Sequence, residues 1–119
     1  MNVIALAFAL SFATVEATAP AVRVTPTTTI PDSARCPQWW ALAQQVGWPG
    51  DQLPHVDRVM WCESTCQPTA HNRRSGASGL MQIMPGWWDG RDPYDPAVNL
   101  AMALDIHEAY GWQAWSCAA

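Results

Sequence analysis

The sequence predicts a single small domain that is mainly helical. Two segments, 53–63 and 96–110, repeat apolar residues at the spacing of an α-helix, and no segment predicts a long strand. The chain has 119 residues, of which 50% are hydrophobic, so it can form one core but not two. Four cysteines behind an apolar leader predict that two disulfides reinforce this core.

Residues 1–17 have the character of a secretory signal peptide. The apolar run of residues 3–13 is too short to span a bilayer, which needs about 20 apolar residues. Small residues at 15–17 predict cleavage after Ala17. No Lys or Arg precedes the run, so a retained N-terminal anchor is the alternative. We expect a secreted, extracytoplasmic protein that contacts a membrane only through an uncleaved N-terminus.

Residues 18–33 are rich in Thr and Pro and hold little that could pack, which is typical of an extended linker. The folded domain is therefore expected over residues 34–119. A domain of this size usually needs reinforcement to be stable.

The cysteines of this domain are Cys36, Cys62, Cys66 and Cys117. We favour the pairs Cys62–Cys117 and Cys36–Cys66, because each joins distant segments. A bond between Cys62 and Cys66 would be strained across one helical turn. The histidines do not form ligand-spaced clusters with the cysteines, so we expect no metal and no other cofactor.

Three helices are expected within the domain. The first begins after Ser33 or Pro37 and continues to about Val46. The second begins near Leu53 and carries Val56, Val59, Met60 and Glu63 on one face.

The third helix has the clearest start signal, with Asp95 as N-cap and Pro96 at the first helical position. It continues to about Tyr110, is apolar on two sides, and is therefore expected at the centre of the domain. Gly111 ends it, and we expect Trp112, Trp115 and Cys117 to tie the tail back onto the body.

Glu63 occupies a position where the second helix should carry an apolar residue, and it lies at the C-terminal end of that helix. Burial and the negative end of the helix dipole both disfavour an ionised carboxylate. The pKa of Glu63 should therefore be raised, which suits a general acid.

A second motif follows Glu63 at a distance of about twenty residues. Residues 75–85 read Ser-Gly-Ala-Ser-Gly-Leu-Met-Gln-Ile-Met-Pro, and a helix beginning Asp-Pro with Asn-Leu in its first turns comes next. Together with Glu63-Ser64, these residues resemble the soluble lytic transglycosylase catalytic domain of the lysozyme superfamily over residues 54–110. The later Ala-Tyr-Asn-any-Gly motif of the family is absent.

The resemblance implies a small lysozyme-like helical fold that cleaves the β-1,4 bond between N-acetylmuramic acid and N-acetylglucosamine in peptidoglycan. Glu63 would act as acid and then as base, leaving a 1,6-anhydro end. By motif position, the substrate-binding residues would be Ser64, Ser75, Met81, Gln82, Met84 and Tyr110, with Ser64 orienting the acid and Tyr110 standing in for the absent motif.

Two other functions are also compatible with the sequence. A lysozyme-type hydrolase would need a second carboxylate in the cleft, for which Asp89 or Asp92 is the candidate. A non-catalytic wall-binding or chitin-binding module could use the eight Trp residues. The net charge of −4 and the absence of Lys argue against nucleic acid as a partner. We expect a monomer that acts on peptidoglycan glycan strands.

Overall fold

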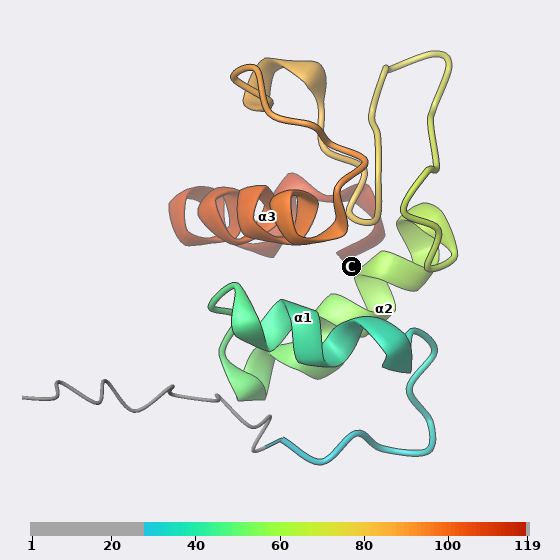
Figure 1. The fold of residues 1–119 in the computed structure, drawn as a ribbon, viewed down its shortest axis with the longest axis vertical. Helices are drawn as coiled ribbons and strands as arrows, with labels where there is room; N and C mark the ends of the chain where they lie inside the picture. Colours follow the sequence, from blue (N-terminus) through green and yellow to red (C-terminus); the bar gives the residue numbers. More distant parts are fainter. Residues whose placement is uncertain (1–27, 119) are drawn as a thin grey trace, which may run out of the picture.

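The computed structural model describes residues 28–118 of the chain (Figure 1). Within that range the helical class is confirmed, and there is no regular strand, only isolated bridges joining residue 78 to residues 71 and 83. The α-helices are α1 (Trp40–Gln45), α2 (Leu53–Ser64) and α3 (Pro96–Tyr110). Short 3-10 helices extend or connect them: η1 (Pro37–Trp39), η2 (Gly50–Gln52), η3 (Pro85–Trp87), η4 (Trp112–Ala114) and η5 (Ser116–Ala118).

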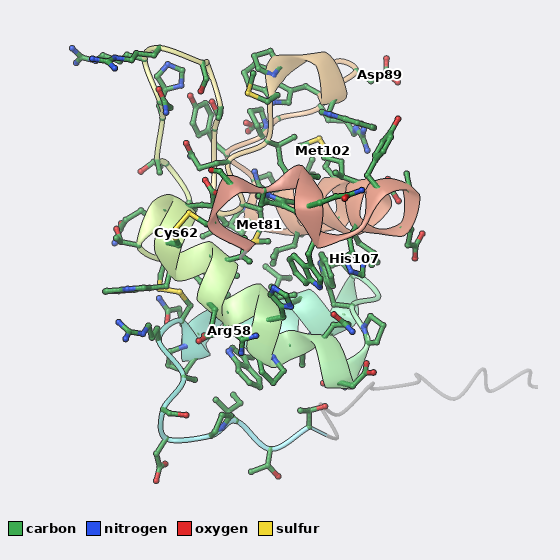
Figure 2. The ribbon with its side chains drawn as sticks, turned by 180° about the vertical axis from the view of Figure 1, so that it is seen from behind. Arg58, Cys62, Met81, Asp89, Met102 and His107 are labelled. Atoms are coloured by element: carbon green, nitrogen blue, oxygen red, sulfur yellow. A yellow bond between two sulfur atoms is a disulfide. The ribbon has the colours of Figure 1, made fainter. Side chains whose placement is uncertain are left out.

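Helix α3 lies at the centre of the molecule, as its two apolar sides predict. Helices α1 and α2 lie on one side of it, and the loops that join α2 to α3 lie on the other (Figure 1). Figure 2 shows Met102 on the side toward those loops and His107 on the side toward α1 and α2. A helix that is apolar all round is stable only when it is covered on several sides. Its buried residues are Asn99, Leu100, Met102, Ala103 and Ile106.

The helix boundaries follow the local signals of the sequence. The Asp95 side chain accepts hydrogen bonds from the N–H groups of Ala97 and Val98, so it caps α3 as expected. Helix α2 ends where Thr65 adopts a left-handed conformation with φ 50°. The first expected helix is divided into η1 and α1, which continue directly into each other.

Both expected disulfides are confirmed. Cys36–Cys66 joins the segment before η1 to the end of α2, and Cys62–Cys117 joins the last turn of α2 to η5. Figure 1 shows the C-terminal end of the chain beside α2, and η5 packs against that helix. Each bond therefore attaches one end of the domain to the same part of α2.

The tryptophans do more than fill the core, because most of them also donate a hydrogen bond from the indole N–H. Much of the chain forms neither helix nor sheet, and its buried carbonyl groups need donors from elsewhere. Trp115, for example, is buried and donates to the carbonyl of Met81, which lies outside the helices, at 2.8 Å. Similar bonds to loop carbonyls run from Trp39 to Cys66 and from Trp88 to Ile83. The other indole bonds run from Trp48 to the Leu100 carbonyl within α3, and to the side chains of Asp57 from Trp40 and of Gln52 from Trp112.

Asn99 on α3 holds the turn that carries the second motif. Its carbonyl oxygen accepts from the Met81 N–H at 2.8 Å, and its amide nitrogen donates to the carbonyls of Ser78 and Pro93, each at 2.9 Å. Gly79 passes so close to Asn99 that a Cβ atom would collide with it, and its φ of 81° favours glycine. The Gly-Leu-Met sequence is thus explained by its contact with α3.

The expected signal peptide and residues 18–27 of the expected linker lie outside the described residues. Residues 28–33 form neither helix nor strand. Within residues 28–118, no helix has the length and apolar character that crossing a membrane requires.

Candidate active site

Two adjoining pockets form one groove, which we call the Glu63 groove. They share Gln82, Met84, Ala114 and Trp115 in their walls. The pocket at the Glu63 end has a volume of about 310 Å³, and its other lining residues are Glu63, Asn72, Ser75, Ala77 and Ser116. The pocket at the aromatic end has a volume of about 290 Å³, and its other lining residues are Ile83, Trp87, Ile106 and Tyr110. Each volume is near the lower limit for a small-molecule site, roughly 300 Å³.

Glu63 lies in the last turn of α2 and is half-buried at one end of this groove. Burial raises the pKa of its carboxyl group above the ordinary value, because the charged form loses hydration. The backbone N–H of Cys117 donates a hydrogen bond to the carboxylate, which lowers the pKa and partly offsets the effect of burial. The net direction is upward, as the helical pattern predicts, and a proton donor near neutral pH needs this direction.

The loop of residues 72–77 forms the wall next to Glu63. The Asn72 side chain accepts hydrogen bonds from the N–H groups of Arg74 and Ser75, at 2.9 and 3.3 Å, which closes a tight turn. The hydroxyl of Ser75 then accepts from the Ala77 N–H at 3.1 Å. Ser75 is exposed, and these bonds hold it at the groove.

Gln82 lies where the two pockets meet, and it has a left-handed backbone with φ 50°. Its amide nitrogen donates to the carbonyls of Ala70 and Gly79, at 3.1 and 2.9 Å. A non-glycine residue persists in this conformation only when its surroundings hold it there. The side chain of Gln82 is therefore a fixed part of the groove and also joins its two neighbouring loops.

Two of the expected site residues are placed in the core. Met81 has no exposed surface, and Figure 2 shows it inside the body of the domain, near α2 and α3. Ser64 is also buried, and its hydroxyl donates to the Met60 carbonyl one turn earlier. Neither side chain lines the Glu63 groove, so we do not propose a substrate contact for either. The physical reason for Met81 is the Asn99 contact, which turns the backbone of residue 81 toward α3.

The other expected residues come together in the groove. Glu63, Ser75, Gln82 and Met84 line the pocket at the Glu63 end, and Tyr110 lines the pocket at the aromatic end. Tyr110 meets Trp87 edge to face, with ring centroids 5.7 Å apart and planes at 76°. Both rings are more than a third exposed, so they offer an aromatic surface to a ligand.

The sequence reasoning missed the wall formed by the C-terminal tail. Ala114, Trp115 and Ser116 line the same pocket as Glu63 and the 72–77 loop, although no family motif could be matched to them. Trp115 is buried and donates to the Met81 carbonyl at 2.8 Å, which fixes this wall to the turn beneath it. The favoured Cys62–Cys117 pair was the signal that could have located the wall, since it places residue 116 close to Glu63.

Glu63 is the only acidic residue among those that line the two pockets. Asp89 and Asp92 are exposed and line neither pocket. Figure 2 shows Asp89 at the outer edge of the loops that precede α3. Across residues 28–118, no three His, Cys, Asp or Glu side chains gather as a metal ion would require.

The fold and groove define a small helical domain, closed by two disulfides, with one half-buried acid in an open groove. Residues 49–106 match the family model of the transglycosylase SLT domain. This part of the chain is therefore a transglycosylase SLT domain, in agreement with the resemblance found from its motifs, and its function is related to peptidoglycan. No curated protein and no solved structure gave a significant match to the chain.

Proposed function

We propose that the protein is a lytic transglycosylase that cleaves the N-acetylmuramic acid β-1,4 N-acetylglucosamine bond of peptidoglycan. The observation that carries this proposal is a single half-buried carboxyl group, Glu63, with a raised pKa in a groove that has no other acidic residue. Most glycosidases place a pair of carboxyl groups about the scissile bond. A reaction that needs only one suits this groove better.

In the first step, the protonated carboxyl group of Glu63 donates its proton to the glycosidic oxygen as the bond from that oxygen to C1 breaks. The carbonyl oxygen of the substrate's own 2-acetamido group bonds to C1 and shares the positive charge. In the second step, the Glu63 carboxylate removes the proton from the C6 hydroxyl of the muramic acid. The C6 oxygen then bonds to C1 and displaces the acetamido oxygen. Glu63 is protonated again, and no water is consumed.

Further features support a polymeric sugar substrate. The groove is open and extends from Glu63 to the exposed rings of Trp87 and Tyr110. Apolar and aromatic walls with a few fixed polar groups are typical of ligand sites, and Gln82 and Ser75 supply such groups. The two disulfides are typical of proteins outside the cytoplasm, where the cell wall lies, so we propose an extracytoplasmic location.

Product analysis tests the proposal directly. The purified domain, residues 34–119, should release muropeptides that end in 1,6-anhydro-N-acetylmuramic acid from isolated cell walls, detected by mass spectrometry. A Glu63→Gln variant keeps the size and shape of the side chain but has no acidic proton, so its activity should fall by several orders of magnitude. Full activity of this variant would refute the role of Glu63.

The same spectra decide between the alternatives. Reducing-end muramic acid would indicate a hydrolase that uses water, and Asp89→Asn and Asp92→Asn variants would then show whether either side chain takes part. The exposed positions of both residues argue against it. Tight binding to cell walls without any turnover over a wide pH range would indicate a binding module instead.

A further inference from the structure

We propose that Cys117 is a positioning residue for Glu63: its backbone N–H, held in place by the Cys62–Cys117 disulfide, orients the carboxyl group in the groove. This inference rests on the proposed role of Glu63 as the acid and extends it to the C-terminal tail.

The disulfide joins the tail to the residue next to the acid. Cys62 directly precedes Glu63 in the last turn of α2, and Cys117 belongs to η5, which packs on that helix. Ser116, the neighbour of Cys117, lines the same pocket as Glu63. One covalent bond therefore sets the position of both the hydrogen-bond donor and part of the pocket wall relative to the carboxyl group.

The tail has a second anchor that does not depend on the disulfide. Trp115 is buried in the core, and its indole N–H donates to the Met81 carbonyl at 2.8 Å. Without the disulfide, the wall at Ala114 and Trp115 should stay in place, while residues 116–118 lose their covalent tether. The local losses are then the donor from Cys117 and the part of the wall that Ser116 forms.

The N–H of Cys117 favours the ionised form of Glu63, so its loss should raise the pKa of this carboxyl group further. It should also free the side chain to rotate. A misplacement of about 1 Å can cost on the order of 100-fold in rate, and a freely rotating acid is misplaced for much of the time. The effect should fall on kcat more than on KM, because the rest of the groove keeps its shape.

The chain contains a matched control in its other disulfide. Cys36–Cys66 also closes a loop at the C-terminal end of α2, but neither of its cysteines adjoins a residue that lines the groove, whereas Cys62 adjoins Glu63 and Cys117 adjoins Ser116. Removing either bond loosens the unfolded chain by a similar mechanism and should lower the stability by about 2–5 kcal/mol. Only the Cys62–Cys117 bond holds a hydrogen-bond donor of Glu63.

The experiment compares Cys62→Ser/Cys117→Ser with Cys36→Ser/Cys66→Ser at a temperature where circular dichroism shows both to be folded. The pKa of Glu63 is measured by NMR titration of its side-chain carboxyl carbon, and kcat and KM are measured against pH. We expect the first variant to show a higher Glu63 pKa and a kcat about 10- to 100-fold lower. Relative to its own maximum, the activity of the Cys62→Ser/Cys117→Ser variant should persist to a higher pH than that of the wild type. The second variant should keep the wild-type values for the Glu63 pKa and the pH profile.

Mild reduction of the wild-type protein provides a test without mutation, which applies even if a variant does not fold. Cys62 is exposed and Cys117 is half-buried, whereas Cys36 and Cys66 are 0% and 5% exposed. The Cys62–Cys117 bond should therefore be reduced before the Cys36–Cys66 bond. Activity should fall as Cys62 and Cys117 become available to an alkylating reagent, while circular dichroism stays unchanged. It should return on reoxidation of samples that were not alkylated.

Two results would overturn the inference. One is a Glu63 pKa that is unchanged or lower when only the Cys62–Cys117 bond is absent. The other is an equal loss of kcat in both double variants. A wild-type protein with no activity on cell walls would refute the proposed function instead, and the NMR titration would still test the contact between Cys117 and Glu63.

Discussion

At the scale of single residues, two opposing effects set the state of Glu63. Its helical position predicts burial, and burial raises its pKa, because a carboxylate in a less polar environment loses hydration. The N–H of Cys117 acts in the opposite direction, since it stabilises the ionised form. Only the first effect could be predicted from local sequence, because the second depends on a residue more than fifty positions away.

The raised pKa makes a prediction about stability. A carboxyl group whose folded-state pKa lies above its unfolded value stabilises the folded state below the unfolded pKa, and this contribution is lost as the pH rises through the folded pKa. The side chain introduced by Glu63→Gln is neutral at every pH, so the variant does not lose stability through ionisation at this position. The variant should therefore melt at a higher temperature than the wild type near pH 7, and the difference should shrink as the pH is lowered toward 4.

Melting curves of both proteins at several pH values provide the measurement. Glu108→Gln is a suitable control, because Glu108 is also helical but exposed. A difference between Glu63→Gln and wild type that does not change with pH would contradict the prediction.

At the scale of secondary-structure elements, the site depends on how α3 holds the turn before it. Asn99 contributes three hydrogen bonds to this turn, and Gly79 allows the backbone to approach it. The result is that Met81 faces the core while Gln82 and Met84 face the groove. Residues 75–85 therefore serve partly for packing, since Met81 belongs to the core and Met84 lines the groove.

A Gly79→Ala substitution should be strongly destabilising. It adds a Cβ that collides with Asn99 and with the Pro93 carbonyl, and it places alanine at a φ of 81°. The left-handed conformation alone costs about 1–2 kcal/mol, and the collision adds to this cost. We expect a loss of at least about 2 kcal/mol in the free energy of unfolding, measured by denaturation in urea.

Gly86→Ala is the matched control for this experiment, because a Cβ at Gly86 meets no atom within 4 Å. Its effect should stay within about 0.5 kcal/mol, as for most surface substitutions. Equal stability of the two alanine variants would show that the turn can move away from α3.

At the scale of the whole molecule, a few long-range bonds hold together a chain with little regular structure. The two disulfides attach both ends of the domain to the C-terminal end of α2, and several indole N–H groups donate to carbonyls in the loops. The aromatic residues therefore divide into a core set and a groove set. Trp48 represents the first and Trp87 the second.

Substitution by phenylalanine should separate these two sets. Trp48→Phe removes the indole hydrogen bond to the Leu100 carbonyl and part of a buried ring, which should cost about 1–3 kcal/mol of stability. Trp87→Phe removes part of an exposed ring, so it should leave the stability nearly unchanged and raise KM for cell-wall substrate. Thermal melting and wall-digestion kinetics measure the two effects, and a Trp87→Phe variant that loses stability instead would contradict this division.

The sequence alone determined the parts that depend on local chemistry. The periodicity of α2 and α3, the Asp95 cap and the place of Glu63 all follow from interactions within a few residues. The sequence favoured the disulfide pairs that the structure confirms, because a Cys62–Cys66 bond would be strained across one helical turn, but it did not exclude Cys36–Cys62 with Cys66–Cys117. The family followed from the motif of residues 75–85 and its distance from Glu63, and the family-model match agrees.

The tertiary structure alone decided which residues face the groove that begins at Glu63. It turned Met81 inward, placed Ala114, Trp115 and Ser116 in the wall, and brought the Cys117 N–H to the carboxyl group. These arrangements join segments far apart in the chain, and the packing of α3 and the tail determines them. Local sequence patterns do not predict contacts between distant segments, so these contacts are seen only in the folded structure.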